Sequence, residues 1–103
     1  MPHKTHQDGT LAEIVVSEYL VGLGFYVFSP VVHQPGPIDI IAINEAGEIF
    51  LIDAKKEGKR LNPGRTKLAR IYRVKTDTQK KLNVIHAYVK EDRTIDFIPP
   101  LEP

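Results

Sequence analysis

The sequence predicts an α/β domain with a mixed central β-sheet of about five strands flanked by helices. Three observations support this fold class: an amphipathic helical pattern near the N-terminus, a hairpin signal in the middle, and two apolar strand-like runs after a short helical segment. The predicted order is helix, three strands, helix and two strands, or αβββαβ for its first six elements. With 103 residues, 42% of them hydrophobic and 26% charged, the chain fits a single domain spanning residues 1–103.

The first helix is expected over Thr10–Leu23. Residues 1–9 are polar and are expected to form a flexible N-terminus. Thr10 and Glu13 fit the Thr-x-x-Glu capping box, and Gly24 supplies the stop. Glu13 lies at the edge of the apolar face, so it is the acid of this helix that could reach packed structure. Capping alone is the alternative explanation of Glu13.

The remaining elements follow from periodicity and from Gly and Pro positions. They are a strand at 25–28, a loop at 29–37, hairpin strands at 38–43 and 49–52, a loop at 57–70, a short helix at 78–82 capped by Thr76 or Asp77, and strands at 84–89 and 94–98.

The central hairpin has a predictable register. If Glu45-Ala46-Gly47 forms a three-residue loop with Gly47 in the left-handed conformation, opposed residues have numbers that sum to 92. This register places Asp39 opposite Asp53. Like charges at opposed positions are destabilising unless something compensates them.

A divalent cation would compensate these charges, and two carboxylates at this separation suit Mg²⁺. Strand alternation puts Lys55 on the same face as Asp53, where its ammonium could hold a water or stabilise phosphate charge. In the alternative interpretation, the aspartates only end strands, and Lys55 and Lys56 protect an exposed sheet edge.

Basic residues concentrate in one stretch of the chain. The formal net charge is +1, yet residues 55–81 contain eleven basic and two acidic residues, a net charge of +9, and the rest of the chain carries −8. A basic segment beside an acidic, metal-suited site fits a phosphodiester substrate. A solvated basic loop is the alternative. The candidate nucleic-acid contacts are Lys56, Lys59, Arg60, Arg65, Lys67, Arg70, Arg73 and Lys75.

Several classes of protein are disfavoured by composition. The absence of cysteine excludes disulfides and thiolate metal sites. No apolar run approaches the ~18 residues that span a bilayer, and the N-terminus has no apolar signal core. We therefore expect a cytoplasmic protein, or one in the host-cell cytoplasm if phage-encoded, with no membrane partner and no small-molecule cofactor.

The arrangement of these short motifs resembles the PD-(D/E)XK nuclease superfamily, and within it the small Holliday junction resolvase-like and phage-type endonucleases. The resemblance covers roughly residues 9–89. It rests on Gly9 followed by Glu13, Gly24-Phe25, Pro37-Ile38-Asp39 and Asp53-Ala54-Lys55. It implies a restriction-endonuclease-like core.

Residue roles follow from this resemblance. It implies that Asp39, Asp53 and the backbone carbonyl of Ala54 bind Mg²⁺, for which Mn²⁺ can substitute, and that Glu13 binds the metal directly or through water. Lys55 would position the attacking water or stabilise the transition state. Gln79 resembles a glutamine often found near such sites. None of the four histidines is assigned to metal.

The implied function is a metal-dependent DNA endonuclease acting on branched or duplex DNA, with a structure-specific, Holliday junction resolvase-like enzyme as one form of it. We expect a homodimer, because one small domain offers one active site for two strands. The alternative is a catalytically inactive nucleic-acid-binding module of the same fold, and a weaker one is a small interaction subunit. The cleaved DNA structure, DNA versus RNA, and the number of metal ions remain open.

Overall fold

The computed structural model describes residues 4–31, 36–61, 68–71 and 74–101. Within these residues it is an α/β fold with a five-stranded mixed sheet, as predicted. The sheet order is β1-β2-β3-β6-β7, in which β3 and β6 are parallel and the other neighbours antiparallel. The elements are α1 (Lys4–Gly22), β1 (Tyr26–Phe28), β2 (Ile40–Ile43), β3 (Ile49–Lys56), β4 (Gly58–Leu61), β5 (Leu68–Ile71), α2 (Asp77–Lys81), β6 (Ile85–Val89) and β7 (Ile95–Ile98).

The first helix begins earlier than the sequence predicted. It starts at Lys4 rather than Thr10, so the Thr10–Glu13 pair lies inside α1 and does not cap its N-terminus. The six preceding residues include no proline, and an established helix extends readily through such a segment. At the other end, the Phe25 N–H donates to the Leu20 carbonyl at 3.0 Å and Gly24 has a φ of +94°, as in a Schellman motif.

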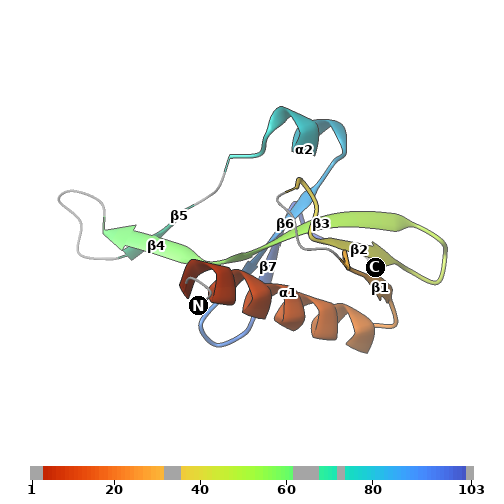
Figure 1. The fold of residues 1–103 in the computed structure, drawn as a ribbon, viewed down its shortest axis with the longest axis horizontal. Helices are drawn as coiled ribbons and strands as arrows, with labels where there is room; N and C mark the ends of the chain where they lie inside the picture. The colour runs from red at the N-terminus through yellow and green to blue at the C-terminus, as the bar shows by residue number, and fades with distance from the viewer. Residues whose placement is uncertain (1–3, 32–35, 62–67, 72–73, 102–103) are drawn as a thin grey trace.

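The core lies between α1 and one face of the sheet (Figure 1). Ala12, Val16 and Leu20 of α1 are buried against alternate residues of β2, β3 and β6. Since side chains alternate across a strand, the residues between these core positions face the opposite side. This second face carries Asp53 and Lys55, and α2 lies over part of it (Figure 1).

The predicted hairpin register is confirmed. Ile40 pairs with Ile52, and Ile43 pairs with Ile49. The Asn44 N–H donates to the Glu48 carbonyl at 3.1 Å, and Gly47 takes a φ of +84°. The turn therefore sets the pairing of the whole hairpin.

The segment predicted as a loop over 57–70 is instead partly a two-stranded ribbon. β4 and β5 pair from Gly58↔Ile71 to Leu61↔Leu68, and Glu57 alone separates β3 from β4. The prediction failed because Gly58–Leu61 and Leu68–Ile71 lack the apolar runs by which the other strands were recognised. The ribbon projects away from the sheet and helices (Figure 1).

The second helix forms where it was expected, at Asp77–Lys81. Thr76 is its N-cap, and Thr76 and Gln79 form a reciprocal capping box. No helix in the described part of the chain is long and apolar enough to cross a membrane.

Candidate active site

Two aspartates from the hairpin meet on the face opposite the core. The Asp39 N–H continues the ladder by donating to the Ile52 carbonyl at 2.9 Å, and the Ala54 N–H donates to Asp39 Oδ2 at 3.0 Å. The carboxyl groups of Asp39 and Asp53 lie close enough for each to act on the pKa of the other. Asp53 is buried, with 7% of its surface exposed. The hairpin thus brings together the pair that its register predicted.

The two carboxyl groups titrate very differently. Burial, the hydrogen bond and charge of Asp53, and the charge of Glu13 raise the pKa of Asp39 to about 7, against a smaller opposing effect of the Ala54 N–H. Burial also acts to raise the pKa of Asp53, but the Asp39 hydrogen bond, Lys55 and Gln79 together lower it below 3.8. Near neutral pH the pair therefore carries between one and two negative charges.

Lys55 neutralises part of this charge. Its Nζ lies 3.1 Å from Asp53 Oδ2, on the same sheet face as predicted by strand alternation. Its side chain is 29% exposed, so the ammonium is accessible to a substrate while it remains paired with Asp53.

Gln79 contacts the same oxygen of Asp53 as Lys55 does. Its Nε2 donates to Asp53 Oδ2 at 2.8 Å and to the Pro37 carbonyl at 3.1 Å. Its Oε1 accepts the Thr76 N–H at 3.1 Å as part of the capping box. The residue that completes the capping box of α2 thus also orients the buried carboxylate.

His86 is the site residue that sequence reasoning missed. It is 2% exposed, and its Nε2 lies 3.3 Å from Gln79 Oε1 and 3.7 Å from Asp53 Oδ2. Because Gln79 Oε1 can only accept, we assign the imidazole proton to Nε2, which leaves Nδ1 to accept from the Tyr88 hydroxyl at 3.4 Å. Burial lowers the pKa of His86, and its electrostatic neighbours act in both directions: Asp53 raises it and Lys55 and Lys75 lower it.

The parallel register explains why His86 was missed. Asp53 pairs directly with His86 across β3 and β6. No turn connects these strands, so the sequence carries no local signal for their relative shift.

The other predicted residues divide into three groups. Glu13 is half-buried and close enough for its charge to act on Asp39, and Lys75 acts in the same way on His86. Lys56 is exposed at the end of β3, and Lys59, Arg60 and Arg70 belong to the β4–β5 ribbon. Arg65, Lys67 and Arg73 lie outside the described residues.

Among the residues that the structure describes, no three His, Cys, Asp or Glu side chains form a group that could hold a metal ion.

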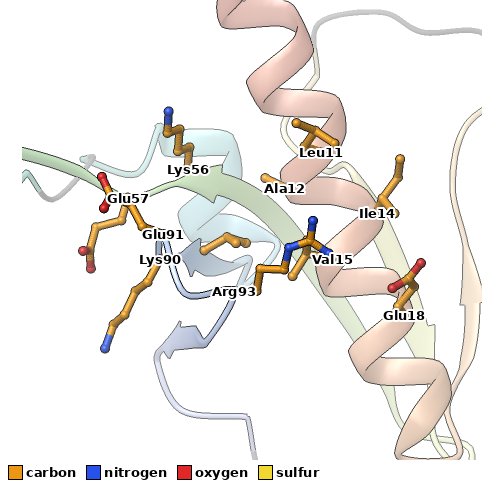
Figure 2. Close-up of a pocket in the computed structure, with 11 residues that line it drawn as sticks. Leu11, Ala12, Ile14, Val15, Glu18, Lys56, Glu57, Lys90, Glu91 and Arg93 are labelled. Atoms are coloured by element: carbon orange, nitrogen blue, oxygen red, sulfur yellow. The ribbon is translucent and has the colours of Figure 1, made fainter.

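Two cavities lie near these elements. A groove of about 340 Å³ separates α1 from the end of β3 and the β6–β7 turn; Figure 2 shows Leu11, Ile14 and Glu18 on the helix side and Lys56, Glu57 and Lys90 opposite them. The second cavity, of about 260 Å³, includes Asp39 in its lining. Only the second therefore adjoins the aspartate pair.

Comparison with known proteins gives a likeness in fold. No protein-family model matches the chain, and no curated protein matches it. Among solved structures, the chain is similar to the bacterial homing endonuclease I-Ssp6803I, with a TM-score of 0.60 and 14% sequence identity. The match covers 92% of this chain and 68% of that one. At this identity the likeness concerns the fold alone.

Proposed function

We propose that this chain is a metal-dependent DNA endonuclease of the PD-(D/E)XK type that hydrolyses phosphodiester bonds. The observation that carries the proposal is the placement of two aspartates, Asp39 and Asp53, at opposed positions of one hairpin, with Lys55 on the same face and 3.1 Å from Asp53. The fold that presents them is similar to that of a bacterial homing endonuclease, which agrees with this activity.

The donor set fits a hard divalent cation. Asp39 and Asp53 offer carboxylate oxygens, and the raised pKa of Asp39 reflects negative charge that a cation would compensate. Asp39, Asp53 and the Ala54 carbonyl would hold Mg²⁺ or Mn²⁺, with Glu13, whose charge acts on Asp39, contributing through water. When bound, such an ion supplies water activation and charge stabilisation at the phosphate.

The chain's own residues orient the reactants. Lys55 holds the attacking water or stabilises the charge that grows on the phosphoryl oxygens. The water oxygen forms a bond to phosphorus as the bond to the leaving sugar oxygen breaks; the water loses a proton and the leaving oxygen gains one. Gln79 keeps Asp53 in place by donating to its Oδ2, and His86 supports Gln79 through its Oε1.

The basic stretch from Lys55 to Lys81 would bind the DNA backbone, with the β4–β5 ribbon as its projecting part. A homodimer would supply the second active site needed to cut both strands. Light scattering during size-exclusion chromatography tests the dimer: a monomer at every concentration would contradict it.

Cleavage of a labelled DNA panel tests the activity. The panel contains a four-way junction, a flap, a linear duplex, a single strand and a supercoiled plasmid, each incubated with Mg²⁺, Mn²⁺ or EDTA. We expect metal-dependent cutting by the wild type and none by Asp53→Ala. Asp96→Asn is the matched control, since Asp96 is a half-exposed acid on β7 that pairs with Lys90 at 3.4 Å.

Either result is informative. Cutting that survives in Asp53→Ala would contradict the assigned site. DNA binding that needs no metal, falls steeply with salt and is never followed by cutting would instead establish the non-cutting nucleic-acid-binding module.

A further inference from the structure

A cavity of about 260 Å³ adjoins the aspartate pair and is not used in the proposed hydrolysis. Of its lining residues that the structure describes, all are apolar except Ser29 and Asp39. The apolar part comprises Phe28, Pro30, Ile38, Ile40 and Ile41. Phe28 is 55% exposed and Ile41 is 38% exposed, so an aromatic ring and an aliphatic side chain face solvent beside a carboxylate.

The sheet register explains this placement. Phe28 pairs with Ile41, and Ile41 pairs with Leu51. Asp39 precedes Ile41 by two residues, and Asp53 follows Leu51 by two. The row formed by Phe28, Ile41 and Leu51 therefore lies on the same sheet face as both aspartates. The two rows lie about 7 Å apart, the length of two strand residues. A nucleotide whose phosphate reaches the aspartates therefore has its base within reach of Phe28.

The chemistry of the cavity selects its occupant. DNA backbone is polyanionic and gains little from an apolar wall, whereas a base can stack on an aromatic ring whatever its sequence. In an uninterrupted duplex each base is stacked on its neighbours and presents only its edges in the grooves. A base can therefore enter the cavity only from an unpaired or extruded nucleotide. A protein partner seated here would cover Asp39 and block the site.

We propose that this cavity binds one unpaired nucleobase, which stacks on Phe28 next to the scissile phosphate. The enzyme then prefers DNA with an unpaired nucleotide at the cutting position over continuous duplex. This inference rests on the proposed nuclease function and names its substrate class.

Fluorescence of 2-aminopurine tests the stacking directly. The protein carries Asp53→Asn to prevent cutting, and the probes are duplexes with one 2-aminopurine either paired or in a short unpaired gap, in Mg²⁺. We expect quenching of the unpaired probe on binding, its loss in Phe28→Ala, and roughly tenfold weaker binding of the gapped DNA by that variant. Tyr26→Ala is the matched control, because Tyr26 lies on the same strand and face but does not line the cavity.

The remaining outcomes each overturn a definite statement. Binding without quenching, or an equal loss of affinity for paired and gapped DNA in Phe28→Ala, would refute the base site and leave the nuclease proposal standing. Failure to bind any DNA would refute the proposed function itself. A change in oligomeric state caused by Phe28→Ala would assign this face to contact between chains. Phe28→Leu, which keeps apolar volume but removes the ring, repeats the test should the alanine variant not fold.

Discussion

Replacement of Asp39 by asparagine should abolish cleavage and yet stabilise the metal-free protein. Asp39 faces a second, ionised carboxylate and carries a pKa raised to about 7. Asparagine keeps the hydrogen bond from the Ala54 N–H, because its Oδ1 can accept it, and its neutral amide relieves the repulsion by Asp53. The variant removes only the charge.

The size of the effect follows from the pKa. A rise from 3.8 to about 7 corresponds to ~4 kcal/mol of destabilisation of the ionised form. Asp39 is only half-buried, so we discount this for solvent screening to ~2 kcal/mol. For a domain of this size, that predicts a melting temperature roughly 10 °C higher at pH 8.

The pH dependence has a definite sign. Between pH 4 and 7 the folded chain holds a proton on Asp39 that the unfolded chain has released, so the stability of the wild type falls as pH rises through this window. Asp39→Asn should lack this fall. Thermal and urea unfolding in EDTA from pH 4 to 8 measure it.

Asp53→Asn is the matched control, and it should change the stability of the metal-free protein in the opposite direction. The pKa of Asp53 is lowered by its partners, so neutralising it removes favourable interactions with Lys55. The reasoning is refuted if Asp39→Asn is no more stable than the wild type at pH 8, or if both substitutions act in the same direction.

Three further predictions concern Lys55, His86 and Gly47. Lys55→Ala should lower the cleavage rate on the order of 100-fold, with Lys90→Ala as the control; equal rates for the two variants would deny Lys55 a role in catalysis. His86→Ala should lower kcat roughly tenfold and leave the KM for DNA unchanged, because it loosens the support of Asp53 without touching the DNA contacts. An unaltered kcat in steady-state kinetics would mean that His86 only fills space. Gly47→Ala should cost about 1–2 kcal/mol in urea unfolding, because its φ is +84° while an added Cβ meets no atom within 4 Å; undiminished stability would contradict the left-handed turn.

The elements that could be predicted are those with local signals. The hairpin register followed from three turn residues and strict strand alternation, and α2 followed from its Thr76 cap. The β4–β5 ribbon was missed because its two short strands lack the apolar runs that marked the central hairpin. The start of α1 was misplaced because Thr10 and Glu13 match a capping motif that here lies within the helix.

The residues of the candidate site also differ in whether a local sequence signal predicts their position. Asp39, Asp53 and Lys55 belong to one hairpin, so their proximity was contained in a single stretch of sequence. Gln79 was suggested by resemblance alone, and its contacts with Asp53 and Pro37 depend on how α2 packs over the sheet. His86 depends on the parallel pairing of β3 and β6, which no neighbouring residue specifies.

The β4–β5 ribbon closes on itself at its base. Gly58 pairs with Ile71, so the chain leaves the end of β3 and returns to nearly the same place before α2. Residues between these two points can be lengthened, shortened or exchanged without shifting the register of the five-stranded sheet. Under the proposed function, the segment assigned to the DNA backbone can therefore vary in length and sequence independently of Asp39, Asp53 and Lys55.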